Sequence, residues 1–202
     1  IVEEQTITPF DVYSRDHFLK RLGAYNSGFN AHLHLDMDRV IPSSDDNVFR
    51  KSVLKGYVHD PIAALMGGVS GNAGLFATAE DLAKIMSVYL NHGQYGGEQI
   101  IDSATIDLFT CTQLPPEQNR RGLGFDKPET LPDKTGPTCE GTPCTSYGHT
   151  GFTGAIAWND PENQLIYIFL SNRTYPNEFN DKLMKDNIRT KIQEIIYEAI
   201  VK

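Results

Sequence analysis

The 202-residue sequence has no apolar run that approaches the ~20 residues a membrane-spanning helix needs. It also lacks positive charge, because 18 Lys and Arg residues stand against 26 Asp and Glu, a net charge of −8 at pH 7. This balance disfavours nucleic acids and anionic membranes as partners, since their phosphates would be repelled. With 40% apolar and 22% charged residues, the composition is that of a folded chain. We therefore expect one globular domain, or one large lobe of a bigger domain, with no nucleic acid partner and no membrane insertion.

The start of the chain lacks the usual signals. No signal-peptide pattern is present, and residue 1 is Ile rather than Met. These features lead us to expect a processed or excised piece of a longer product.

Cysteine is scarce, with only Cys111, Cys139 and Cys144. An odd count excludes a complete set of intrachain disulfides. Cys139 and Cys144 flank the short loop Glu-Gly-Thr-Pro and could bridge in an oxidising compartment, or they could be two ordinary loop thiols. Because the sequence gives no geometry, both alternatives stay open.

Periodicity and capping signals predict helices, a long loop and a β-hairpin. The clearest element is a helix over 79–92, in which Thr78 is the cap, Asp81 completes a capping box and Gly93 ends the helix. The full set of expected segments is a helix over 8–22, mostly irregular chain over 24–75, the helix over 79–92, a short helix after Ser103, a long loop over 126–146, hairpin strands at 153–159 and 165–171, and a helix over 187–201.

Three finer expectations follow for these segments. In the helix over 8–22, Thr8 is the cap, Pro9 takes the first helical position and Asp11 completes a capping box. The run 165–170 is nearly all apolar, which predicts a strand buried on both faces. The apolar stripe of the terminal helix consists of Ile188, Ile192, Ile195, Ile196 and Ile200. Together these elements predict an α+β fold with helices packed on an antiparallel sheet.

Three short motifs appear in chain order: Ser52-x-x-Lys55, Tyr89-x-Asn91 and Lys134-Thr135-Gly136. Taken literally, this is the set used by penicillin-recognising serine hydrolases, in which the Lys helps to activate the Ser. The context opposes that interpretation. Tyr89 falls on the apolar stripe of a helix, the third motif is followed by Pro137 within a loop, and Ser52 has weak helix signals. We therefore interpret these motifs as chance matches.

A more informative segment is Gly148-His149-Thr150-Gly151-Phe152-Thr153-Gly154, which directly precedes the predicted hairpin. By itself it is a glycine-rich turn that contains a histidine. Three other segments add to it: the glycine-rich loop and helix start over 67–83, Gly122-Leu123-Gly124-Phe125, and the strand end over 170–176. In order and spacing, residues from about 15 to 202 resemble the serine β-lactamase-like and penicillin-binding-protein family.

One further segment, Gly56-Tyr57-Val58-His59-Asp60-Pro61, resembles a particular branch of that family. The branch is found in Bacteroidetes envelope proteins, and some of its members are fused to a family 3 glycoside hydrolase (β-N-acetylglucosaminidase) domain. The resemblance implies a periplasmic or cell-envelope location.

The resemblance also implies which part of the family's domain this chain contains. Residues 8–30 resemble the segment just after the family's tyrosine motif, so the nucleophile and tyrosine motifs would precede this chain. Residues 1–202 would then be the C-terminal part of one β-lactamase/transpeptidase-like domain that lacks its N-terminal strands. We expect a fragment of a β-lactamase, D-amino-acid peptidase or esterase that forms an acyl-enzyme on a serine upstream of Ile1, and that is inactive alone.

The resemblance assigns roles to a few residues. His149-Thr150-Gly151 would be the third motif, with His149 in place of the usual Lys, and the Phe152 N–H would be one oxyanion-hole donor. Asn172 would lie near the substrate carboxylate, although a strand-end turn residue is a simpler interpretation. The substrate would be a small molecule or a peptidoglycan-like compound, and no cofactor or metal is expected.

The resemblance also bears on partners. In the family, N-terminal strands pair with the last strand, so their loss would expose an apolar edge around Ile166–Leu170. We therefore expect a homodimer, or retention of the missing N-terminal part of the same domain as a separate fragment.

Two alternatives remain at this stage. The chain could be a non-catalytic module of a multidomain envelope protein. It could also be a zinc hydrolase, because His32, His34 and Asp36 resemble a metallo-β-lactamase signature in which Met37 replaces the last His. Strict alternation in an extended segment would place these His and Asp side chains on one face.

Overall fold

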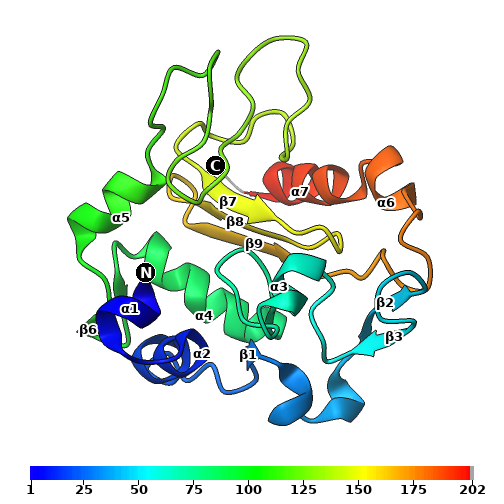
Figure 1. Ribbon diagram of the computed structural model, residues 1–202. Coiled ribbons are helices and arrows are strands. Elements are labelled where there is room, and N and C mark those ends of the chain that lie inside the picture. Colours follow the sequence, from blue (N-terminus) through cyan, green and yellow to red (C-terminus); the bar gives the residue numbers. More distant parts are fainter. Residues whose placement is uncertain (201–202) are drawn as a thin grey trace. The chain divides into compact units, whose positions relative to one another are not determined.

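Figure 1 shows a computed structural model of the chain, which describes residues 1–200. The chain divides into two compact units. The first unit comprises Ile1–Ile85 and Asn172–Asn180, and the second comprises Met86–Ser171 and the residues from Asp181 onward. No helix of the described part is long and apolar enough to cross a membrane.

The first unit is built from short helices and two small antiparallel strand pairs. Strand β1 pairs with β4, and β2 forms a hairpin with β3. Its elements are α1 (Val2–Thr6), α2 (Phe10–Ser14), the π-helical turn η1 (Arg15–Leu19), β1 (Gly28–Phe29), the 3-10 turns η2 (Ala31–Leu33) and η3 (Met37–Arg39), β2 (Pro42–Asp46), β3 (Ser52–Lys55), α3 (Pro61–Leu65), β4 (Leu75–Phe76) and the start of α4 (Ala79–Leu90).

The helix predicted over 8–22 is present only in part. Regular α-helix covers α2 and gives way to η1, and Gly23, with a φ of 64°, ends the segment as predicted. The predicted capping box is wrong, because Pro9 occupies the cap position and no side chain caps the helix. Instead, the Phe10 N–H donates to the Glu3 carboxylate at 2.9 Å. Glu3 lies on α1, a helix that was not predicted from the sequence.

Helix α4 confirms the clearest prediction. Its first turn is capped by Thr78, whose hydroxyl accepts from the Asp81 N–H at 3.2 Å, and Gly93 follows its end with a φ of 89°. Asp81 is completely buried. Its carboxylate accepts from the Asn26 N–H at 2.7 Å and from the Ser27 hydroxyl at 3.1 Å, and it pairs with Lys84 at 2.9 Å. The predicted capping box is therefore only half formed, because the Asp81 carboxylate does not bond back to Thr78 and instead ties α4 to the chain before β1.

The second unit has a three-stranded antiparallel sheet in the order β7-β8-β9. Its core is formed by Ile156, Trp158 and Tyr167, with Ile192 and Ile196 packed against them. The elements are β5 (Gln94–Tyr95), β6 (Glu98–Gln99), α5 (Ser103–Thr110), β7 (Tyr147–Thr150), β8 (Ile156–Asp160), β9 (Leu165–Phe169), α6 (Lys182–Lys185) and α7 (Ile188–Ala199). Helices packed on an antiparallel sheet are the predicted α+β fold.

Strand β9 corrects one prediction. The run 165–170 was expected to be buried on both faces, but only Tyr167 is fully buried and Leu170 is 43% exposed. The reason is its place in the sheet. Among the described residues, β9 pairs with β8 alone and forms an edge of the sheet.

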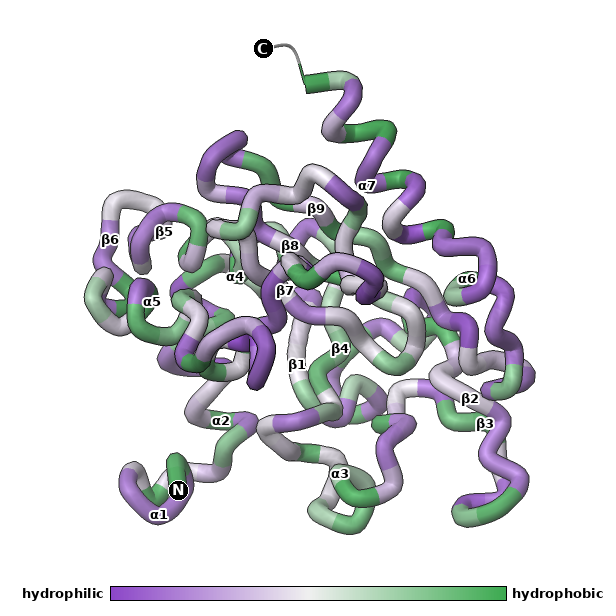
Figure 2. The backbone as a smooth tube through the Cα atoms, turned by 90° about the horizontal axis from the view of Figure 1, so that it is seen from above, coloured by the Kyte–Doolittle hydropathy of each residue, from purple (hydrophilic) through white to green (hydrophobic). Residues whose placement is uncertain are grey.

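Helix α7 is present, but its buried stripe is rotated from the predicted one. Ile192 and Ile196 pack on the core, whereas Ile195 is 64% exposed. Arg189 and Gln193 are buried instead. Both have partners, since the Arg189 guanidinium donates to the Gly154 and Ala155 carbonyls and the Gln193 side chain accepts from the Cys139 N–H. Figure 2 shows hydrophobic and hydrophilic residues alternating along α7.

The loop predicted over 126–146 contains no helix or strand, as expected. It holds two of the cysteines. Cys139 is buried and Cys144 is exposed, and both carry free thiols, so the structure contains no Cys139–Cys144 bridge. Burial raises the pKa of the Cys139 thiol.

Candidate functional site

Strand β7 carries the His149-Thr150-Gly151 motif at one edge of the three-stranded sheet. Antiparallel pairing with β8 places Gly148 opposite Trp158 and His149 opposite Ala157. The side chain of His149 is exposed, and its Nδ1 lies 2.7 Å from the Thr150 carbonyl oxygen. Because a carbonyl only accepts, this contact places the proton on Nδ1. Nε2 is then the ring nitrogen left to face a ligand.

The residues after β7 form a tight turn into β8. The Gly151 N–H donates to the Ala155 carbonyl at 2.8 Å, and the Gly154 N–H donates to the Gly151 carbonyl at 3.0 Å. Gly154 has a φ of 101°, a conformation that side chains rarely allow. The Phe152 side chain, at the tip of the turn, is 61% exposed. The motif is therefore held by backbone bonds while His149 and Phe152 project outward.

The glycine-rich segment over 122–125 leads into a residue that pairs with β7. Asp126 and Gly148 exchange two backbone hydrogen bonds, of 2.7 and 3.1 Å. Phe125 contacts both Tyr89 and Tyr147 edge-on, with ring centroids 5.0 and 5.2 Å apart. Tyr89 is therefore part of an aromatic cluster in the second unit. This packing role agrees with the interpretation of Tyr89-x-Asn91 as a chance match.

Lys127 is a charged residue near the motif that the sequence analysis missed. It is only 6% exposed, its Nζ donates to the Thr145 carbonyl at 3.1 Å, and it lies 5.7 Å from the centre of the Tyr147 ring. Burial lowers the pKa of Lys127 and raises the pKa of Tyr147. No local sequence signal marks this lysine as buried, because it stands at the start of a polar loop.

Asn172 lies in the first unit, in the segment 172–180. Its side-chain N–H₂ donates to the Pro42 carbonyl, and its Oδ1 lies 2.9 Å from the Thr174 hydroxyl, which is also 2.6 Å from the Ser43 carbonyl oxygen. Thr174 is completely buried. One N–H of Asn172 thus joins this segment to β2, while its Oδ1 and the Ser43 carbonyl compete for the single hydroxyl proton of Thr174.

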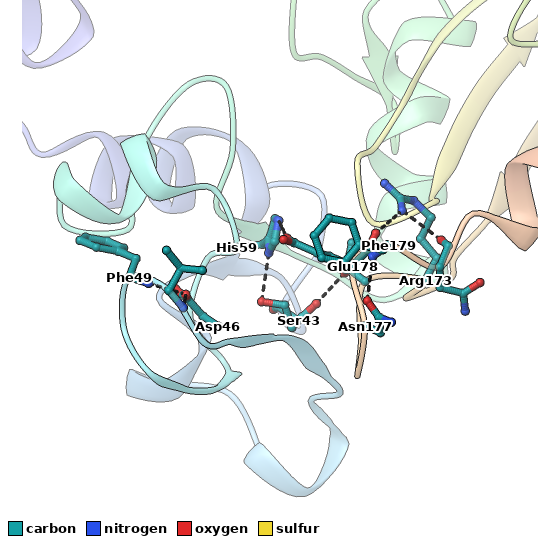
Figure 3. Close-up of polar contacts among 12 residues, drawn as sticks. Ser43, Asp46, Phe49, His59, Arg173, Asn177, Glu178 and Phe179 are labelled. Carbon is teal, nitrogen blue, oxygen red and sulfur yellow. Dashed lines mark hydrogen bonds and ion pairs between the residues drawn. The ribbon is translucent and has the colours of Figure 1, made fainter.

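Further polar contacts hold the same segment in the first unit (Figure 3). The Arg173 guanidinium donates to the Glu178 and Asn180 carbonyls, at 2.9 and 3.1 Å. His59 Nδ1 lies 3.0 Å from the Ser44 hydroxyl, and its Nε2 lies 3.9 Å from the Glu178 carboxylate. The segment is therefore joined to backbone carbonyls of β2 and to the His59 side chain, which follows β3.

The literal motif set has no suitable geometry. Ser52 and Lys55 lie on β3, where residues three apart point to opposite faces and cannot meet as they would on a helix. Lys134-Thr135-Gly136 lies in the long loop, outside any strand. Both findings agree with the interpretation of these motifs as chance matches.

The zinc alternative loses its structural basis. The segment that holds His32 and His34 is not extended as expected, because η2 coils the chain over Ala31–Leu33. His32 instead stacks on Tyr57, with ring centroids 3.9 Å apart, and its Nδ1 contacts the Gly56 carbonyl. Within residues 1–200, no three His, Cys, Asp or Glu side chains form a group that could hold a metal ion.

The sequence of this chain matches one family model and several curated proteins. The family model described as Beta-lactamase matches residues 1–187. Two curated relatives are named "Putative D-alanyl-D-alanine carboxypeptidase". The one from Salmonella schwarzengrund is 34% identical over 202 aligned positions, which cover 91% of this chain and 44% of the relative. The one from Escherichia coli strain K12 is 35% identical over 189 positions, which cover 87% of this chain and 42% of the relative. The chain thus spans less than half the length of these relatives.

Solved structures agree on the fold. Simvastatin synthase from Aspergillus terreus matches with a TM-score of 0.67 at 16% identity, over 100% of this chain and 52% of that one. A β-lactamase from Mycobacterium bovis matches with a TM-score of 0.61 at 17% identity, over 98% of this chain and 58% of that one. These identities are too low to show more than the fold, whereas the family match extends over nearly the whole sequence. The chain belongs to the β-lactamase family.

Proposed function

We propose that this chain is part of a serine hydrolase that works through an acyl-enzyme, and that β7 borders its substrate cleft. The observation that carries the proposal is the place of His149-Thr150-Gly151. The motif lies at the exposed end of an edge strand and is followed at once by a tight, backbone-bonded turn. A rigid strand end of this kind can present side chains and N–H groups to a substrate without rearrangement.

The nucleophile is proposed to come from outside this sequence. The one S-x-x-K match, at Ser52, is on a strand and does not bring its serine and lysine together. The curated relatives are more than twice as long as the part that this chain matches. We infer that a helical S-x-x-K motif and a Y-x-N motif lie in a further part of the same domain.

In the proposed reaction, the serine oxygen attacks the substrate carbonyl carbon while its proton passes to a neighbouring base. The resulting oxyanion accepts hydrogen bonds from the Phe152 N–H and from the N–H of the serine itself. The carbonyl re-forms as the leaving group departs with a proton, and water then hydrolyses the acyl-enzyme by the same two stages. With a proton on Nε2, His149 would donate a hydrogen bond to a substrate carboxylate.

The proposed substrates are D-amino-acid peptides of the cell wall. Support comes from the names of the curated relatives, which specify a D-alanyl-D-alanine carboxypeptidase. Acyl esters and β-lactams use the same chemistry and belong in the test. A substrate of this kind places the protein in the periplasm or cell envelope, which we propose as its location.

The isolated 202-residue chain is expected to show no hydrolysis of nitrocefin, p-nitrophenyl acetate or a D-alanyl-D-alanine peptide. A longer product that adds an upstream S-x-x-K should hydrolyse at least one of them, and an acyl adduct should appear on that serine by mass spectrometry. As the matched control, Ser52→Ala should change neither result. Turnover by the isolated chain that disappears with Ser52→Ala would contradict the proposal.

A non-catalytic module is the second candidate. The Asn172 amide contacts the Pro42 carbonyl and the Thr174 hydroxyl. These contacts give Asn172 a structural role that needs no substrate, which favours a non-catalytic module. The two candidates are separated by the longer product. If an intact S-x-x-K serine takes no acyl group from any of the three substrates, the module is the better account.

Association through β9 is a separate expectation. The strand offers unpaired backbone groups along one edge among the described residues, and we propose that it pairs with a second copy or with the remainder of the domain. Light scattering of the isolated chain should therefore show a dimer or a retained peptide. Ile168→Lys, on the opposite face of β9 from the buried Tyr167, should shift the chain toward monomer, because a charge at an edge opposes pairing. A clean monomer with no second peptide would argue against this edge as an interface.

A further inference from the structure

A pocket of about 420 Å³ lies in the second unit, between the end of α4 and the β5–β6 hairpin. It is lined by Ser87, Asn91, Gln94, Tyr95, Gly96 and Gly97. None of these residues carries a charge, although the whole chain has a net charge of −8. The lining consists of one hydroxyl, two amides, one phenol ring and glycine backbone. It therefore suits a neutral, polar ligand better than an ion.

Three of the lining side chains are unused by the chain. Among the described residues, Asn91, Gln94 and Tyr95 make no side-chain hydrogen bond to the protein. Gln99, in the same hairpin, is the contrast, because its amide donates to the His92 carbonyl at 3.0 Å and to the Ile101 carbonyl at 2.6 Å. The hairpin is thus anchored by one amide, while the amides and the phenol around the pocket keep their donors and acceptors available.

The backbone of the pocket is open and is held by hydrogen bonds. Gly96 and Gly97 have φ values of 59° and 85°, and a Cβ added to either would meet no atom within 4 Å. Glycine is therefore required here by the turn and not by close packing. The hairpin is also bonded to the turn that follows α4, since the Gln94 N–H donates to the Asn91 carbonyl at 3.1 Å and the Ile100 N–H donates to the Gly93 carbonyl at 2.8 Å. A ligand would meet groups that are already in place.

We infer that this pocket is a binding site for a neutral saccharide. A sugar ring presents C–H groups on its faces and hydroxyls around its rim. The faces suit the half-buried Tyr95 ring, and the hydroxyls suit the two amides, each of which offers both donors and an acceptor. Such sites are shallow and polar, unlike the apolar pockets that hold drug-sized ligands.

The test is a titration of the whole 202-residue chain, labelled with ¹⁵N, with N,N′-diacetylchitobiose and with cellobiose. Either sugar should shift the backbone amide signals of Asn91 and of residues 94–97 while leaving most others unchanged. Because the pocket is open and the contacts are few, the Kd should be on the order of 1 mM. The measurement needs no catalytic activity, so its failure would leave the proposed hydrolase function untouched.

Variants make the assignment specific. Tyr95→Ala should weaken binding by about tenfold or more, and Tyr95→Phe by less, because the ring stays while the hydroxyl is lost. Asn91→Ala and Gln94→Ala, at exposed positions, should each weaken binding severalfold without a change in folding. Tyr25→Ala, at a 73% exposed tyrosine of the first unit, is the matched control and should bind as the original chain does. The inference is overturned if neither sugar shifts these signals at tens of millimolar, or if the shifts survive in both Tyr95→Ala and Asn91→Ala.

Discussion

Replacement of Asp81 by alanine is expected to lower the free energy of unfolding by about 3–5 kcal/mol, the cost of removing one partner of a buried ion pair. The carboxylate is completely buried and is shared by Asn26, Ser27 and Lys84. Without it, the Lys84 ammonium, which also donates to the Gly23 carbonyl, loses the carboxylate at 2.9 Å that balances its charge. The Asn26 N–H and the Ser27 hydroxyl lose an acceptor in the same step.

Urea unfolding followed by circular dichroism measures this effect. Glu80→Ala is the matched control, because the neighbouring carboxylate on the same helix is 82% exposed and pairs with the same lysine at 3.6 Å. An exposed pair of this kind contributes about 0–1 kcal/mol, so the control should unfold nearly as the original chain does. Equal losses in the two variants would show that the buried network around Asp81 does not stabilise the fold.

The same residue shows where prediction from sequence stops. Thr78, the apolar stripe and Gly93 are local signals. They predicted the first residue of α4 and placed its end at 92, close to Leu90, where the helix ends. Two partners of Asp81, Asn26 and Ser27, stand 55 and 54 positions earlier in the chain, and no pattern within the helix predicts them. Asn172 is similar, because its bond to Pro42 spans 130 positions. Contacts of this length depend on the tertiary fold, which a periodicity argument does not contain.

The errors in strand β9 and helix α7 have a common cause. Both predictions assumed that apolar side chains are buried and that polar side chains face water. In α7, Arg189 and Gln193 are buried because backbone groups of Gly154, Ala155 and Cys139 bond to them. In β9, the apolar side chains are only partly covered. The sequence shows which side chains favour burial, but the number of covering layers and the available partners are set by the assembled unit.

The turn and the hairpin that follow His149 were predicted better than the core, because their signals are local. The glycines around His149 indicated a turn, and the two apolar runs after it indicated the hairpin of β8 and β9, whereas strand β7 was not among the predicted segments. What the pattern did not reveal is that the first of these glycines is required by packing. Gly148 is buried opposite Trp158, and its φ is not in the left-handed region.

Replacement of Gly148 by alanine is therefore expected to destabilise the second unit by roughly 3 kcal/mol, at the upper end of the range for overpacking. A Cβ at this position would lie 2.2 Å from the Ala157 carbonyl oxygen and 2.7 Å from the Trp158 Cα. These are backbone atoms of the paired strand, so no side-chain rotation relieves the clash. The gain of ~0.5–1 kcal/mol that alanine brings over glycine in a strand is too small to compensate.

Gly151→Ala provides the comparison within the same motif. Its Cβ would meet the Ala155 Cβ at 3.6 Å, the Thr153 hydroxyl at 3.8 Å and the Ala155 N at 4.0 Å, which are ordinary contacts. Thermal and urea unfolding of the two variants should therefore differ by more than ~2 kcal/mol, with Gly151→Ala within about 0.5 kcal/mol of the original chain. Similar stability in both would mean that β7 can move away from β8. The position of His149 would then not be fixed by the sheet, and the proposal that β7 presents a preformed motif to substrate would lose its physical basis.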